Sequence, residues 1–284
     1  MRAPVLAALA ALLVLPVAAW SLPEPPPAPA AATPPQDAVE LSHGFWTPYM
    51  HLAALDIPRG IRPGAWLQIG AANCTAAFVV QDPAGALYIT TAGHCTEHVG
   101  QRVSVKEGVL VAALGDMVPF GTVVARWPAG LDAALVRIDE DKYPQVNPRM
   151  TGWGGPTGLA TANPGTASVV KHYGWGWVTW YDFSTRCRAG VFNSWQANTW
   201  WYAGIGGGGD SGSAVMTADG KALGILDWGG GIIVPTPTGA FLSTMEGGVR
   251  FDRVLQAWAN EGRDLSLVLG GPVNEVCTPE PPVP

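Results

Sequence analysis

Charged residues are scarce in this chain, which narrows the classes of protein to which it can belong. Lys, Arg, Asp and Glu make up 13% of the 284 residues, and the formal net charge is −6. The chain has no basic stripe, which disfavours nucleic-acid binding. Gly (36) and Pro (26) are by contrast abundant, which favours many short strands joined by turns over a helical bundle. The length suits one large domain or two small lobes.

Only the start of the chain has a long apolar run. Residues 3–20 follow Arg2, and the small residues Val17-Ala18-Ala19 precede a cleavage point. This pattern predicts a signal peptide over residues 1–20 and a secreted, extracellular protein. The alternative is an uncleaved anchor that tethers the protein to the cell surface, although Pro4 and Pro16 weaken that case.

The composition divides the rest of the chain into four parts. Residues 21–35 are a Pro-rich spacer, because such a segment favours extended conformations and builds no core. Residues 36–62 are more apolar and form either an N-terminal extension or a short propeptide. The globular domain is expected over residues 63–270, with lobes at about 63–145 and 150–270. A second Pro-rich tail covers residues 271–284.

Short runs rich in β-branched and aromatic residues predict an all-β domain. The period of Val254, Leu255 and Trp258 predicts one helix, over residues 251–260. The expected strands are 65–69, 75–80, 86–90, 102–105, 121–127 and 133–138 in the first lobe, and 166–178, 213–216, 222–226, 231–234 and 264–269 in the second.

Four cysteines in an exported chain imply two disulfides. Cys74, Cys95, Cys187 and Cys277 allow three connectivities. Cys74 and Cys95 are close in sequence, and two facing strands could bring them together. Free buried thiols are the alternative reading.

Three short motifs suggest nucleophilic catalysis. His94 lies in Thr-Ala-Gly-His-Cys, Asp132 precedes an apolar strand, and Ser211 lies in Gly-Asp-Ser-Gly-Ser. Serine needs an adjacent base at neutral pH, histidine has a suitable pKa, and a buried aspartate fixes the histidine tautomer. Each motif alone is ordinary, since a lone His beside Cys is more often structural. Together they predict a catalytic triad.

The order His–Asp–Ser and these motifs resemble the chymotrypsin/trypsin-like serine peptidases, particularly the bacterial secreted branch. The resemblance covers about residues 63–270 and includes Gly152-Trp153-Gly154 and the terminal helix followed by a strand. It implies two antiparallel six-stranded β-barrels, with the active site in the cleft between them. The order is wrong for an α/β-hydrolase lipase or esterase.

The resemblance also implies roles for further residues. The backbone N–H groups of Gly209 and Ser211 would form an oxyanion hole. Asp227, Trp228 and Gly229 would belong to the strand that binds substrate, although the family usually has Ser where this chain has Asp227. The family commonly ties the His-bearing loop to an earlier strand, which implies a Cys74–Cys95 disulfide and leaves Cys187 with Cys277.

Residues near Ser211 bear on substrate specificity and on the partner of Asp210. Ile205 lies six residues before Ser211, where trypsin-like enzymes carry Asp, so the resemblance implies apolar or aromatic substrate side chains rather than Lys or Arg. The adjacent Gly206–Gly208 run is read equally as a flexible loop or as a pocket wall. Because the residue before the serine is buried in family members, the resemblance implies a cationic partner for Asp210. Arg149 is a candidate, although a solvated surface arginine is the simpler interpretation of Arg149.

Two other patterns have simpler interpretations. His94 and His98 flank Glu97 at helical metal-pair spacing, but no third ligand is evident, so no metal is expected. The many tryptophans are read as barrel core, with an exposed platform for glycan or peptide as the alternative. That cluster comprises Trp175, Trp177, Trp180, Trp195, Trp200 and Trp201.

The sequence therefore predicts a secreted, monomeric serine endopeptidase that cleaves protein or peptide substrates through an acyl-enzyme. It needs no cofactor and, once its signal is removed, no membrane. A catalytically silent homologue that serves as an extracellular binding module is the main alternative.

Overall fold

A computed structural model describes the chain from Gly60 onward, with several gaps. The segments predicted as signal peptide (1–20) and spacer (21–35), and residues 36–59 of the extension, lie outside the described residues. None of the helices in the described part is long and apolar enough to cross a membrane. The described residues are 60–107, 116–176, 186–230, 234–235, 241–275 and 277.

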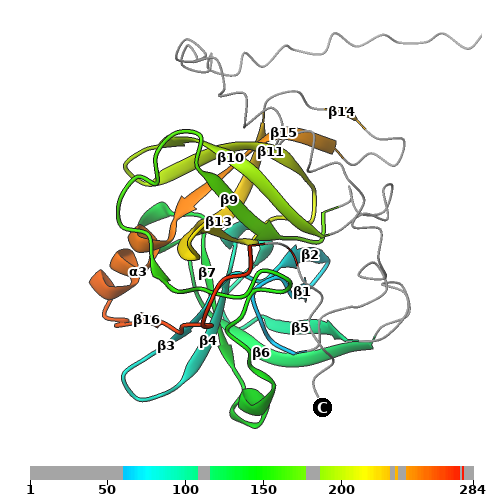
Figure 1. Cartoon of the computed structure of the whole chain (residues 1–284). Coiled ribbons are helices and arrows are strands. Elements are labelled where there is room, and N and C mark those ends of the chain that lie inside the picture. The colour runs from blue at the N-terminus through cyan, green and yellow to red at the C-terminus, as the bar shows by residue number, and fades with distance from the viewer. Residues whose placement is uncertain are drawn as a thin grey trace, which may run out of the picture. The chain divides into compact units, whose positions relative to one another are not determined.

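Two mainly antiparallel sheets make up the domain (Figure 1). The first contains β1 Trp66–Ile69, β2 Ala72–Thr75, β3 Val79–Gln81, β4 Leu87–Thr91, β5 Arg102–Glu107, β6 Asp116–Arg126, β7 Ala134–Ile138 and the late strand β16 Ser266–Leu267. The second contains β8 Gly158–Leu159, β9 Val169–Tyr173, β10 Cys187–Trp195, β11 Thr199–Gly207, β12 Ala214–Thr217, β13 Lys221–Gly230, β14 Val234–Pro235 and β15 Phe241–Arg250.

The second sheet closes into a six-stranded barrel. Its neighbours run β15-β11-β10-β9-β12-β13, and β13 pairs again with β15. Short strands β8 and β14 extend this ring at β13 and β15. The register of β13 on β15 shifts between Leu226 and Trp228, so Asp227 lies at a bulge. Such irregularities re-aim side chains and are common near active sites.

The first sheet closes through a bent strand. β2 and β3 are consecutive, and residues between them bond to both sides: Ala76 N–H donates to Ala65 and Ala77 N–H to Thr90. Counting residues 72–81 as one strand, the ring runs β1, β2/β3, β4, β7, β6, β5 and returns to β1. The expected all-β class with two antiparallel six-stranded barrels is thus confirmed.

The core of each barrel follows the alternation of its strands. In β1, Leu67 and Ile69 point inward and are fully buried, while their neighbours are half-buried. In the second barrel, Trp200 and Tyr202 alternate inward and stack with ring centroids 5.8 Å apart. Two members of the tryptophan cluster, Trp175 and Trp200, are thus buried and belong to the core.

Helix α3 (Phe251–Asn260) confirms the one helix expected from the sequence. It buries Phe251, Val254, Ala257 and Trp258, a helical repeat that faces the barrels. The Phe251 ring lies 4.7 Å from the ring of Phe78 in the first barrel. The helix therefore continues β15 and packs across to the other lobe.

Three long strands escaped the sequence analysis, namely β10, β11 and β15. Gly190, Gly204 and the Gly247–Gly248 pair interrupt their apolar alternation, and glycine is normally depleted in strands. Tyr202 explains two of these glycines, because a side chain at Gly190 or Gly204 would overlap its ring. Packing of a large aromatic residue overrides local strand propensity here.

Two described residues outside the expected 63–270 belong to the domain. Ile61 is fully buried and its N–H donates to Gln145 O at 3.0 Å, although residues 36–62 were assigned to the extension. Asn274, assigned to the tail, donates its N–H to Trp153 O at 2.7 Å. Backbone hydrogen bonds of Ile61 and Asn274 thus add these residues to the predicted domain.

Candidate active site

His94 and Asp132 are joined by two hydrogen bonds. The backbone N–H of His94 donates to Asp132 Oδ1 at 2.8 Å, and the ring Nδ1 lies 2.7 Å from Oδ2. Asp132 is 4% exposed, whereas the His94 side chain is 39% exposed. A buried carboxylate on Nδ1 favours the tautomer that leaves Nε2 free to accept a proton.

The turn that carries His94 is a single 3₁₀ turn, Gly93–Cys95. A side chain at Gly93 would lie 2.9 Å from Asp132 Oδ1, so glycine permits the aspartate to approach. Arg126, at the end of β6, donates to the carbonyls of Gly93 and Glu97. Since Thr96 is already extended, His98 does not share a helical face with His94, and the metal-pair spacing has no structural counterpart.

Asp132 follows a tight loop in which two non-glycine residues have positive φ. Trp127 (φ 53°) and Ala129 (φ 48°) are both left-handed, which costs about 1–2 kcal/mol each. Trp127 N–H donates to Ala133 O at 2.7 Å and so closes the loop. The loop turns β6 into β7 with Asp132 directed at His94.

Ser211 lies on a turn held by both barrels. Its carbonyl accepts the N–H of Thr75 at 2.8 Å, and the following Gly212 N–H donates to Leu226 O at 2.7 Å. Thr75 also donates its hydroxyl to Gly209 O at 2.8 Å. Since β2, which contains Thr75, also binds the His94 turn through the Cys74–Cys95 bond, one strand positions both candidate catalytic segments.

The turn that carries Ser211 leaves two backbone N–H groups unpaired within the described residues. Gly209 has φ 106°, a conformation that favours glycine. Neither its N–H nor that of Ser211 donates to another group within the described residues. Two such unpaired donors on one turn can bind a developing oxyanion.

The structure pairs Asp210 with Arg188, not with Arg149. Asp210 is fully buried and accepts the N–H groups of Gly176 at 2.6 Å and Gly207 at 2.9 Å, while Arg188 Nη1 forms an ion pair with its Oδ2. Arg149 Nη1 instead donates to Gly270 O at 2.8 Å. The candidate Arg149 is therefore not the partner of Asp210, and Arg188 was missed because β10, which carries it, was not recognised as a strand.

Asp227 lies beside the His94–Asp132 pair. It is 6% exposed, and its Oδ2 accepts the Val249 N–H at 3.0 Å. Burial, and secondarily the charge of Asp132, raises the pKa of Asp227 well above its usual value, and the Val249 hydrogen bond offsets this only in part. Burial and the neighbouring negative charge thus both favour the neutral form of this carboxyl group.

The neighbouring strand residues present a partly exposed surface. Trp228 is 37% exposed and stacks on Trp201 with centroids 6.3 Å apart, and Gly229 is half-buried. Ile205 is half-buried at a bulge of β11. Beside it, a side chain at Gly206 would overlap the carboxylate of Glu246, which is 1% exposed; this buried acid was not foreseen from the sequence.

Both disulfides are present. Cys74 bonds to Cys95 within the first barrel, and Cys187 bonds to Cys277, which ties the C-terminal segment to β10. The two disulfides therefore stabilise the turn that carries His94 and the strand that carries Arg188.

Trp177 and Trp180 of the aromatic cluster lie outside the described residues.

Metal-binding side-chain types gather at one place in the described residues. Potential ligand atoms of His94, Asp132 and Asp227 lie within 4.8 Å of one another. The hydrogen bonds between His94 and Asp132 already engage Nδ1 and both Asp132 oxygens. The geometry thus suits a proton-transfer pair better than an ion.

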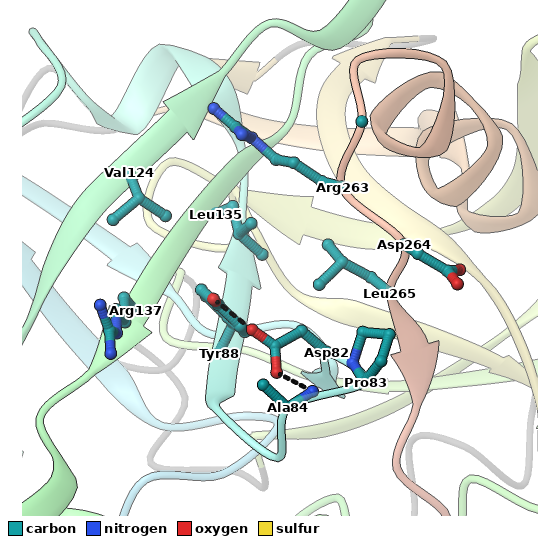
Figure 2. Close-up of a pocket in the computed structure, with 11 residues that line it drawn as sticks. Asp82, Pro83, Ala84, Tyr88, Val124, Leu135, Arg137, Arg263, Asp264 and Leu265 are labelled. Carbon is teal, nitrogen blue, oxygen red and sulfur yellow. Dashed lines mark hydrogen bonds between the residues drawn. The ribbon is translucent and has the colours of Figure 1, made fainter.

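A separate hollow of about 560 Å³ lies between the β3–β4 hairpin, strands β6 and β7 and the segment after α3 (Figure 2). None of His94, Asp132 and Ser211 lines it. Asp82 there accepts the Tyr88 hydroxyl at 2.9 Å and the N–H of Ala84 at 3.0 Å. These bonds stabilise the hairpin turn, and with the Ala86 N–H they lower the pKa of Asp82.

No protein-family model matches the chain, and no curated protein matches it significantly. Solved structures similar to it include Thermobifida fusca protease A, which is 21% identical with a TM-score of 0.49 over 74% of this chain and 99% of its own. A Nocardiopsis protease is 19% identical with a TM-score of 0.48, covering 73% and 98%. A Cellulomonas bogoriensis chymotrypsin is 18% identical with a TM-score of 0.44, covering 73% and 99%. The chain is thus similar to bacterial proteases over their nearly complete lengths.

Proposed function

We propose that the protein is a serine endopeptidase of the chymotrypsin-like type. The observation that carries this proposal is the 2.7 Å contact between His94 Nδ1 and the buried Asp132 Oδ2. Ser211 is held on a turn anchored to the same strand as the His94 turn. Nucleophilic catalysis by serine requires a base within hydrogen-bond reach of the hydroxyl, and this shared anchoring supports such a placement of Ser211 beside His94.

In the proposed reaction, Ser211 Oγ attacks the carbonyl carbon of the scissile peptide bond and its proton passes to His94 Nε2. Asp132 stabilises the imidazolium, and the N–H groups of Gly209 and Ser211 bind the oxyanion. The intermediate collapses as His94 gives the proton to the leaving amine. Water, deprotonated by His94, then hydrolyses the acyl-enzyme and regenerates the Ser211 hydroxyl.

The preferred substrates are proteins or peptides with an apolar or aromatic side chain before the scissile bond. Ile205 supports this preference, and Trp228 with Trp201 adds an aromatic surface on the neighbouring strand. Glu246 beside Gly206 is the group that would instead bind a cationic side chain. A library that varies this substrate position through all side chains therefore decides between Ile205 and Glu246 as the determinant.

Export to an oxidising compartment belongs to the same proposal, since both pairs of cysteines are bonded. The experiment is hydrolysis of an unfolded protein substrate and the peptide library by purified protein. Ser211→Ala should abolish turnover, while Ser266→Ala, an exposed serine on β16, should retain it. A folded protein without turnover would favour the binding-module alternative.

A further inference from the structure

Asp227 is a buried titratable group that the proposed hydrolysis does not use. It lies on β13 at a bulge, and one of its oxygens, one of Asp132 and one ring nitrogen of His94 lie within 4.8 Å of one another. Two carboxyl groups therefore share one buried site behind one imidazole. The question is which of them carries charge.

The hydrogen bonds differ between the two carboxyl groups. Asp132 accepts on both oxygens, from the backbone N–H and the ring of His94. Asp227 accepts only the Val249 N–H, on Oδ2, and its buried Oδ1 has no hydrogen-bond partner within the described residues. Donors stabilise an ionised carboxylate, so the negative charge belongs on Asp132.

No cation from the neighbouring described elements faces Asp227 to offset a second negative charge. Arg250, on the paired strand β15, is bound to Asp252 and to the carbonyls of Gln196 and Ala197. Helix α3 lies beside β13, and the side chains that it buries are apolar, Val254 among them. Asp132 is the charged group that influences Asp227.

Like charges this close in a buried site do not both ionise. One proton therefore stays with the pair. We place it on Oδ1 of Asp227, because this buried oxygen otherwise has no hydrogen-bond partner within the described residues. Burial and the Asp132 charge raise the pKa of Asp227 in the same direction. A buried oxygen left without a hydrogen bond would otherwise destabilise the folded protein.

We propose that Asp227 is a neutral carboxylic acid that donates its Oδ1–H toward the Asp132 carboxylate and so positions the triad without adding charge behind His94. This rests on the proposed function, in which Asp132 orients the general base. Asp227 is thus a positioning residue, since it acts through Asp132. An ionised Asp227 would instead place a second negative charge behind His94 and move the acid limb of the pH–rate profile upward.

The test compares Asp227→Asn, which keeps a neutral donor and an acceptor, with Asp227→Leu, which keeps neither. Infrared difference spectra of wild type minus Asp227→Asn at pH 7 should contain the C=O band of a protonated carboxyl group. Asp139→Asn is the control, because Asp139 pairs with Arg102 at the surface and is ionised. Absence of the protonated band at pH 7 would overturn the proposal, and this readout does not depend on peptidase activity.

Kinetics give the second readout. The acid limb of kcat/KM should stay within about 0.3 pH unit in Asp227→Asn, because no charge is removed. A shift of about one pH unit toward lower pH would show that wild-type Asp227 is ionised and would overturn the proposal. Asp227→Leu should lower kcat about 10- to 100-fold, the effect of losing one hydrogen bond to a charged group, with KM changed less than about twofold.

Discussion

Asp132 holds His94 by its backbone and by its ring at once. The 2.8 Å bond to the backbone N–H fixes the turn, and the 2.7 Å contact with Nδ1 orients the imidazole. The buried residue therefore both builds the turn and sets the tautomer. This double contact makes Asp132 the most informative position for mutagenesis.

Asp132→Asn should preserve the turn that carries His94 but change the tautomer of the His94 ring. The amide oxygen still accepts the His94 N–H, but an NH₂ group facing Nδ1 makes Nδ1 the acceptor and places the ring proton on Nε2. We expect kcat to fall by about four orders of magnitude with little change in KM. Steady-state kinetics, with thermal unfolding as the control for folding, test this. A loss of less than tenfold would contradict the orienting role of Asp132.

Arg188→Met should destabilise the protein strongly. It leaves the Asp210 carboxylate fully buried without its cation, which costs about 3–5 kcal/mol. Arg149→Met is the matched control, since the hydrogen bond of Arg149 to Gly270 O joins it to a neutral carbonyl, and we expect about 1 kcal/mol there. Urea unfolding of both variants in a Ser211→Ala background gives the comparison. Equal losses would reject Arg188 as the special partner of Asp210.

Gly212→Ala should inactivate the protein, whereas Gly262→Ala should not. Both glycines have positive φ, 87° and 80°, so both substitutions cost about 1 kcal/mol from the backbone. A side chain at Gly212 would also meet the Thr75 carbonyl and Ala92 N, while nothing lies within 4 Å at Gly262. Peptide hydrolysis and urea unfolding of both variants separate close packing from backbone strain. Full activity of Gly212→Ala would show that the turn is not held as described.

His172 should make the protein acid-sensitive. It is fully buried with its Nε2 3.0 Å from the Tyr202 hydroxyl, and burial lowers its pKa to about 3 from 6.5. Between these values the unfolded chain binds more protons than the folded one, so stability falls as pH falls, by at most about 1.4 kcal/mol per pH unit. Asp227, whose pKa is raised, acts in the opposite sense, because stability falls as pH rises above 3.8.

The difference between wild type and His172→Gln isolates the histidine, since Asp227 is present in both. Urea unfolding from pH 7 to pH 4 should show a stability gap that narrows steadily as pH falls. A gap independent of pH would mean that His172 binds protons equally in the folded and unfolded protein, which would contradict the effect of its burial.

The sequence motifs predicted His94, Asp132 and Ser211 because each lies in a local pattern, and the short strands of the first barrel follow from their β-branched runs. Arg188 and Glu246 could not be found in this way. Their roles depend on β10 and β15, whose glycines make room for Tyr202 and Trp201 from a neighbouring strand. The contact between Asp227 and Asp132 likewise depends on a bulge in β13, which the residue types alone do not indicate.

Labelling of the purified protein with a fluorophosphonate tests the central claim most directly. An activated serine becomes phosphonylated, so intact mass and peptide mapping should find one adduct per chain, on Ser211, and none in Ser211→Ala. Denatured protein should not react, because activation depends on the folded His94–Asp132 pair. A folded, disulfide-bonded protein that forms no adduct at Ser211 after removal of residues 36–59 would contradict the account.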